Sequence, residues 1–178
     1  FLEAVPADST LSFVAVLHLA PDRESRLADL LQSASSVPVT QVTGTVAIEP
    51  GHVYVVPPGK QLTVQDTRLE IDDFDQPGNR RHAIDAFFES LAASPAAAAG
   101  IIVSGTGTDG AVGLKALKQQ GGLVLVQDPD DATHAGMPRS AMDTGVVDAV
   151  LPAHEMATAL PRMLRRVPAL SDTPDTLG

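Results

Sequence analysis

The chain has 178 residues, 44% of them apolar, and carries 22 acidic against 12 basic side chains for a formal charge of −10. This length fits one domain with a sizeable core, and the acidic balance argues against sequence-independent binding of nucleic acid or docking on anionic lipid. The lack of cysteine excludes disulfides, a thiolate nucleophile and cysteine-ligated zinc, and fits a reducing cytosol. No apolar run approaches the roughly 18 residues that a membrane span needs, and no signal peptide is visible. We therefore expect a cytoplasmic protein without membrane insertion.

The chain alternates strand-like and helix-like segments. Continuous apolar runs bounded by turn residues predict buried strands over residues 12–19, 101–103, 123–127 and 146–151. Apolar residues at helical spacing predict helices over residues 23–33, 84–93, 152–166, from Gly110 onward, and in a short piece that opens at Gly136. Short β-like pieces, separated by Gly and Pro turns, lie over residues 37–42, 45–48, 52–56, 61–64 and 68–71. The last few of these pieces predict an antiparallel meander.

The alternation predicts an α/β fold, with a doubly wound, mostly parallel sheet, helices on both faces and a small antiparallel edge meander. We expect one domain over residues 1–167 and a disordered polar tail over 168–178. The segment that begins at Phe1 resembles the last turn of a helix. We therefore expect that the chain was cut from a longer protein.

A glycine-rich turn is the main candidate for a site. The run Ile101–Val103 ends at Ser104 and is followed by glycines that surround a single charged residue, Asp109. A strand, a tight turn and a helix in this order place the turn at the carboxyl edge of a parallel sheet, where ligands bind in open α/β folds.

One interpretation of this turn is a dinucleotide site. Gly105, Gly107 and Gly110 spell G-x-G-x-x-G between a strand and a helix, and Asp128 ends the next strand. Against this interpretation, Asp109 would lie beside the pyrophosphate, where like charges repel, and the chain is short for a dehydrogenase. The dinucleotide module stays as an alternative.

A second interpretation pairs the carboxylate with a histidine. Asp109 can accept the Nδ1–H of an imidazole, so that Nε2 faces a nucleophile. His18 ends the predicted strand over 12–19, so parallel packing would bring it to the same edge. A third strand end should then supply a serine on a sharp turn. The chain contains no Gly-x-Ser-x-Gly, so we expect that serine upstream of Phe1.

The chain resembles the chemotaxis receptor methylesterases of the CheB type over nearly its whole length. The motifs that carry the resemblance are His18–Asp22, Pro50–Gly59, Ile84–Ala92, Ser104–Gly110 (similar to TGMGxDG) and Gly136–Ala141 (similar to GMPRsA). Thr106 departs from the family, which usually has methionine there. The sequence around His18 looks more like that of an esterase domain fused to a methyltransferase.

The resemblance implies hydrolysis of glutamyl methyl esters on chemoreceptors, with deamidation of receptor glutamines as a further reaction. It implies His18 as general base, Asp109 as its orienting carboxylate, and a serine from an upstream Gly-x-Ser-x-Gly-Gly turn. Gly105, Thr106, Gly107, Met137 and Arg139 would belong to the active-site loops or bind substrate. The implied partners are methylated chemoreceptor helices and a receiver or methyltransferase domain of the parent protein, and no cofactor or metal is implied.

Structural explanations remain open for each of these residues. His18 can be a strand-end histidine bonded to a loop carbonyl. Asp109 can be an N-cap of the helix after Gly110, and Asp85 a helix-face charge or cap. His52, His82, His134 and His154 have no zinc-like spacing and are expected at the surface. A docking or regulatory domain of the same fold, without catalysis, also stays open.

Overall fold

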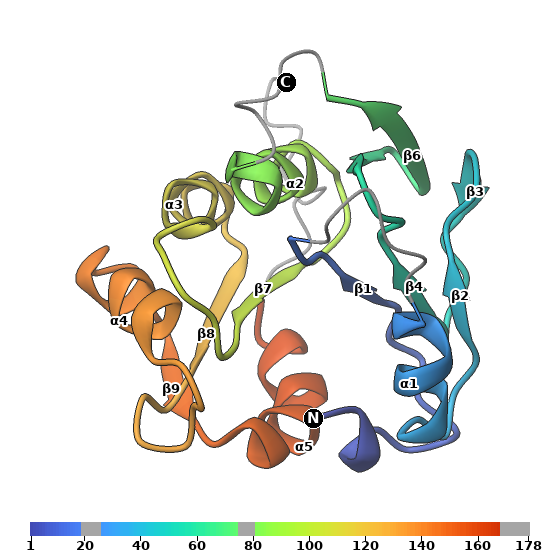
Figure 1. Ribbon diagram of the computed structural model, residues 1–178. Helices are drawn as coiled ribbons and strands as arrows, with labels where there is room; N and C mark the ends of the chain where they lie inside the picture. Colours follow the sequence, from blue (N-terminus) through green and yellow to red (C-terminus); the bar gives the residue numbers. More distant parts are fainter. Residues whose placement is uncertain (19–25, 75–80, 168–178) are drawn as a thin grey trace, which may run out of the picture.

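The computed structural model describes residues 1–18, 26–74 and 81–167 (Figure 1). Its helices are η1 (Leu2–Ala4, a 3-10 helix), α1 (Leu27–Ser33), α2 (Ala83–Ala92), α3 (Ala111–Gln119), α4 (Gly136–Asp143) and α5 (Ala153–Leu164). Its strands are β1 (Phe13–Ala15), β2 (Val39–Gln41), β3 (Val46–Ala47), β4 (Val53–Val55), β5 (Lys60–Gln65), β6 (Arg68–Asp73), β7 (Ala99–Ile102), β8 (Leu123–Gln127) and β9 (Ala149–Leu151). Within these ranges, no helix combines the length and the apolar character needed to cross a membrane.

The first parallel sheet has the order β1-β4-β2. Tyr54 in β4 aligns with Val14 on one side and with Thr40 on the other. All three residues of β4 are buried, as expected for a central strand with neighbours on both sides. The segment 52–56, expected among the antiparallel pieces, is therefore the middle of a parallel sheet.

The second parallel sheet has the order β7-β8-β9. All five residues of β8 are buried, whereas β7 and β9 are only partly buried. Helices α2 and α3 lie on one side of this sheet and α5 on the other (Figure 1), and α5 also contacts η1. The continuous apolar run of β8 is thus explained by cover on both faces.

The antiparallel meander has the order β3-β6-β5. Gln65 pairs with Arg68, so Asp66 and Thr67 form a two-residue hairpin turn. Asp66 takes a positive φ of 54°, which aspartate tolerates better than most residues.

The main core joins all three sheets. Tyr54 of β4, Leu69 of β6, Phe88 of α2, Leu114 of α3 and Val124 of β8 belong to one buried cluster. A separate cluster holds α5 against β8 through Met156 and Leu125, and Phe13 and Ile101 pack against it.

The expected fold class is confirmed, since parallel sheets are flanked by helices and accompanied by an antiparallel meander. The strand pairing differs from the expectation in one respect. The parallel strands form two three-stranded sheets, because no described strand pairs with both β1 and β7. The strand expected over 12–19 is short, since only Phe13–Ala15 pair with β4. The start of the helix expected from Arg23 and the tail 168–178 lie outside the described residues.

Candidate active site

His18 and Asp109 meet where two sheets end. His18 follows β1 of the first parallel sheet, and Asp109 closes the glycine turn that follows β7 of the second. The Nε2 of His18 lies 2.8 Å from Oδ2 of Asp109. The imidazole side chain is 42% exposed and the carboxylate 6% exposed. A buried acceptor therefore holds a ring that is itself partly exposed to solvent.

Backbone amides hold the Asp109 carboxylate from two directions. The N–H of Ile84 donates to Oδ2 at 2.9 Å, and the N–H groups of Asp85 and Gly110 donate to Oδ1 at 2.9 Å each. Two of these amides belong to the first turn of α2, where unpaired N–H groups and the helix dipole favour an anion. Asp109 thus caps α2, whereas the structural alternative left open from the sequence was an N-cap of α3.

The nitrogen that faces Asp109 differs from the expected one. We expected Nδ1 at the carboxylate and Nε2 toward a nucleophile, but Nε2 takes the contact with Asp109. Nε2 is the ring nitrogen farthest from the backbone, so a ring that approaches the carboxylate end-on meets it with this atom. The nitrogen left for proton transfer is Nδ1.

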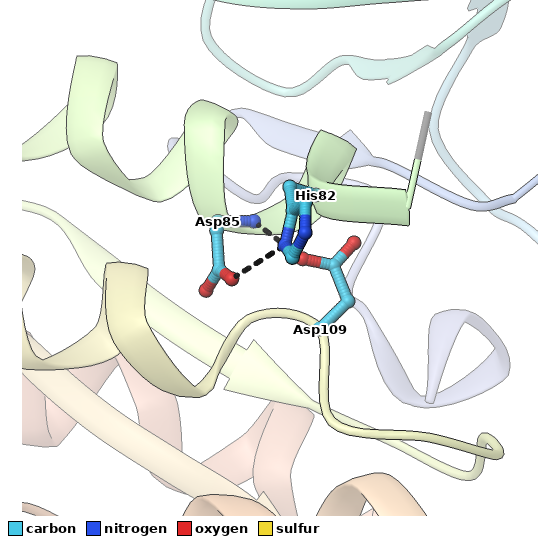
Figure 2. A group of neighbouring side chains, drawn as sticks. All are labelled: His82, Asp85 and Asp109. Atoms are coloured by element: carbon cyan, nitrogen blue, oxygen red, sulfur yellow. Dashed lines mark hydrogen bonds and ion pairs between the residues drawn. The ribbon is translucent and has the colours of Figure 1, made fainter. Parts of the chain in front are cut away.

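A second carboxylate lies beside the first. Figure 2 shows Asp85, Asp109 and the ring of His82 close together, and their ligand-type atoms all lie within 4.8 Å of one another. Oδ1 of Asp85 accepts the N–H of Gly113 at 2.8 Å, and Oδ2 lies 3.7 Å from Nδ1 of His82. Both oxygens of Asp109 already accept backbone N–H groups, and these donors occupy positions that a shared cation would need. We therefore assign no metal to this group.

The glycine turn is bonded to the end of β8 and to the segment after it. Ser104 donates its N–H to Oε1 of Gln127 at 2.7 Å, and Gly105 donates its N–H to the carbonyl of His134 at 2.9 Å. The N–H of Met137 in turn donates to the carbonyl of Gly105 at 2.9 Å. Gly107 has φ of +91°, a conformation that L side chains rarely adopt.

The structure brings together most of the predicted loop residues. The side chain of Met137 lies against Gly105, and Gly136 lies against the backbone of Thr106 and Gly107. The exposed side chain of Arg139 makes no hydrogen bond or ion pair among the described residues. The place of Arg139 in α4 is fixed by its backbone N–H, which donates to the carbonyl of Ala135.

The start of α3 is poorly suited to a pyrophosphate. The N–H of Gly110 is bonded to Asp109 and that of Gly113 to Asp85, so two amides that would bind phosphate already have acceptors. The two carboxylates would also repel a phosphate. The geometry therefore gives the dinucleotide interpretation no support.

Two polar residues of the site were not predicted to belong to it. Asp85 was interpreted as a helix-face charge or a cap, and it is buried and accepts an N–H from the first turn of α3, as a cap does. Gln127 is a buried amide at the end of an apolar strand, and this position was the only sequence signal for it. The Nε2 of Gln127 also donates to Oδ2 of Asp131 at 2.7 Å. The backbone N–H of Ala153 and this amide hold the pKa of Asp131 below its ordinary value of 3.8.

The fold and the site define an α/β protein with a histidine–carboxylate pair at the carboxyl ends of its parallel strands. Comparison with known proteins identifies the family. A family model described as CheB methylesterase matches residues 1–160, and the chain belongs to this family.

Similar proteins and one solved structure support this assignment. A protein-glutamate methylesterase/protein-glutamine glutaminase of Geobacillus kaustophilus is 30% identical over 169 residues, which cover 92% of this chain and 48% of that protein. A protein of the same description from Xanthomonas oryzae is 35% identical over 164 residues, covering 89% and 46%. The crystal structure of the Thermotoga maritima CheB methylesterase catalytic domain is similar with a TM-score of 0.74 and 27% identity, covering 92% of this chain and 87% of that one. The chain thus spans about half the length of these curated relatives.

Proposed function

We propose that this chain is the catalytic part of a protein-glutamate methylesterase that acts in the cytoplasm on methylated chemoreceptors and also deamidates receptor glutamines. The observation that carries the proposal is the 2.8 Å contact between Nε2 of His18 and Oδ2 of Asp109. The printed descriptions of the curated relatives name both activities. Residues 1–167 form the catalytic unit in this proposal.

The proposed reaction is acyl transfer through a serine supplied by the parent protein. Nδ1 of His18 removes the serine proton as the oxygen attacks the ester carbonyl, and Asp109 stabilises the imidazolium through Nε2–H. The imidazolium then protonates the departing methoxide to give methanol. Water attacks the acyl-serine with Nδ1 again as base, which releases the glutamate and regenerates the serine. With a glutamine substrate, ammonia leaves in place of methanol.

Backbone amides of the glycine turn are the proposed stabilisers of the oxyanion. Thr106 and Gly107 are exposed, and their N–H groups have no acceptor within the described part of the chain. Preorganised N–H donors aimed at a developing oxyanion are worth about 3–4 kcal/mol each when measured by removal. The family usually has methionine at the position of Thr106. In this proposal the backbone N–H of that position stabilises the oxyanion, so no methionine side chain is needed there.

We place the serine on a strand between the two parallel sheets. Among the described strands, β1 pairs only with β4 and β7 only with β8, so each has an unpaired side. His18 and the glycine turn follow the carboxyl ends of these two strands. A parallel strand between β1 and β7 would end at the same edge, and its following turn would present a side chain beside His18.

The parent protein in this proposal joins the chain to a receiver or a methyltransferase domain. The curated relatives extend well beyond the matched region. An uncharacterised 104.1 kDa protein of Rhodobacter capsulatus is 35% identical over 148 residues, which are only 15% of its length. Related domains thus occur within much larger proteins.

The test is methanol release from methylated chemoreceptor by the parent protein. We expect His18→Ala to lower kcat by about 10³-fold or more, because the serine loses its base. His154→Ala is the matched control, since His154 is an exposed histidine whose ion pair is with Glu155, at 3.9 Å. Full activity of His18→Ala would remove the proposed base. A parent protein that binds receptor but releases no methanol would instead indicate a docking domain.

A further inference from the structure

We propose that Asp85 is a positioning residue that keeps Asp109 in place for His18, by means of a hydrogen bond between two helices. The proposal rests on the proposed hydrolase function and adds a residue to it. The hydrogen bonds of Asp85 go to Asp109 and Gly113 and none goes to the imidazole of His18, so Asp85 acts on His18 only through Asp109.

Two carboxylates form a crossed pair of bonds between α2 and α3. Asp109 precedes α3 and accepts the N–H groups of Ile84 and Asp85 in the first turn of α2. Asp85 lies in that same turn and accepts the N–H of Gly113 in the first turn of α3, at 2.8 Å. Neither helix has a side-chain hydrogen bond from its own N-cap residue. Each helix start is therefore held by a carboxylate of the other segment.

The two helices touch at the position of this bond. A Cβ added at Gly113 would lie 2.6 Å from the carbonyl oxygen of Asp85 and 2.7 Å from Cβ of Phe88. Asp85 is only 8% exposed, so water is a poor substitute for its acceptor oxygen. If this hydrogen bond were lost, the buried N–H of Gly113 would have no acceptor. The start of α3 would then shift until the N–H reached another acceptor.

A shift of this segment would move the catalytic carboxylate. Asp109 and Gly110 lead directly into α3, while the amides that fix the Asp109 carboxylate belong to α2. If the start of one helix moves relative to the start of the other, the direction of Oδ2 of Asp109 therefore changes. His18 approaches from a different sheet and would not follow this displacement.

The acceptor oxygen, and not the charge, is the feature that the proposal requires. A second carboxylate within 4.8 Å of Asp109 adds like-charge repulsion, and the helix starts offset it. Asparagine keeps an acceptor oxygen at the same distance from the backbone but carries no charge. Asp85→Asn should therefore retain the function that Asp85→Ala loses.

The experiment compares kcat and KM for methanol release by the parent protein. For Asp85→Ala we expect kcat to fall about 10- to 100-fold with KM nearly unchanged, as for a small misplacement of a catalytic group. Asp85→Asn should stay within about threefold of the wild type. Asp29 is the matched control, because it is an exposed first-turn acid of α1, and Asp29→Ala should not change kcat. If Asp85→Ala does not fold, Asp85→Leu fills the same space without an acceptor and takes its place.

A spectroscopic measurement separates this proposal from the proposed function. In the parent protein with ¹⁵N-labelled histidine, the Nε2–H proton of His18 should be protected from solvent exchange in the wild type and in Asp85→Asn, but not in Asp85→Ala. This pattern in a protein that releases no methanol would support the positioning role while the hydrolase function fails. Wild-type kcat in Asp85→Ala, or equal losses in the alanine and asparagine variants, would overturn the proposal.

Discussion

At the scale of single residues, the site depends on the hydrogen bonds that stabilise one buried carboxylate. Asp109 faces three backbone N–H groups and one imidazole, so the cost of removing it from water is offset by charge-assisted hydrogen bonds. The meeting of His18 and Asp109 could be anticipated, because both residues follow strand ends. The nitrogen of His18 that faces Asp109 could not, since ring orientation depends on tertiary packing. The role of Asp85 was also hidden, because its partner Gly113 is brought close only by the packing of α2 on α3.

A prediction at this scale concerns Asp131, whose pKa is lowered by the N–H of Ala153 and the amide of Gln127. A lowered pKa stabilises the fold above the unfolded value of 3.8, and this contribution is lost as the pH falls through the folded pKa. Asp131→Asn should therefore lower the denaturation midpoint at pH 7, and the difference from wild type should shrink as the pH falls below 3.8. Asp130→Asn is the control, because the Asp130 carboxylate accepts no hydrogen bond within the described residues. A difference that grows in acid would contradict the assignment.

At the scale of elements, the contact between α2 and α3 sets the geometry of the site. Gly113 allows the two helices to approach until a first-turn carboxylate of one reaches an amide of the other. Periodicity predicted both helices, because each buries an apolar face. It did not separate β4 from the meander, since short apolar pieces look alike whether their partners are parallel or antiparallel. The actual partners of β4 come from distant segments.

The packing of these helices makes Gly113→Ala a sharp test. Alanine favours a helix over glycine by about 1 kcal/mol, but here its Cβ would lie 2.6 Å from a backbone oxygen. Overpacking of this kind costs about 1–3 kcal/mol, so we expect a net loss of stability in chemical denaturation. Gly44→Ala serves as the control, because its added Cβ meets nothing within 4 Å. A more stable Gly113→Ala variant would show that the helices can separate at low cost.

At the scale of the whole molecule, the arrangement is two parallel sheets and a meander around shared apolar clusters. The alternation of strands and helices predicted the α/β class, because the burial pattern of each element follows from its own residues. The division into two parallel sheets was not predicted, since strand order depends on which segments meet in space.

The unpaired sides of β1 and β7 lead to a prediction for the parent protein. If a strand lies between them, backbone amides on those sides should exchange with solvent far more slowly in the parent protein than in the 178-residue chain alone. Amides of β8, which are bonded on both sides in either case, provide the reference in hydrogen–deuterium exchange. Equal exchange from β1 and β7 in the two proteins would exclude the proposed strand.

The origin of His18 and Asp109 on separate sheets has a mechanical consequence. Their 2.8 Å contact joins the two parallel sheets, and no strand pairing among the described residues connects these sheets. The distance between His18 and Asp109 therefore depends on how the two sheets are placed relative to each other. A neighbouring domain that moved one sheet by an ångström or two would break this contact, and with it the proposed activity, without binding either residue.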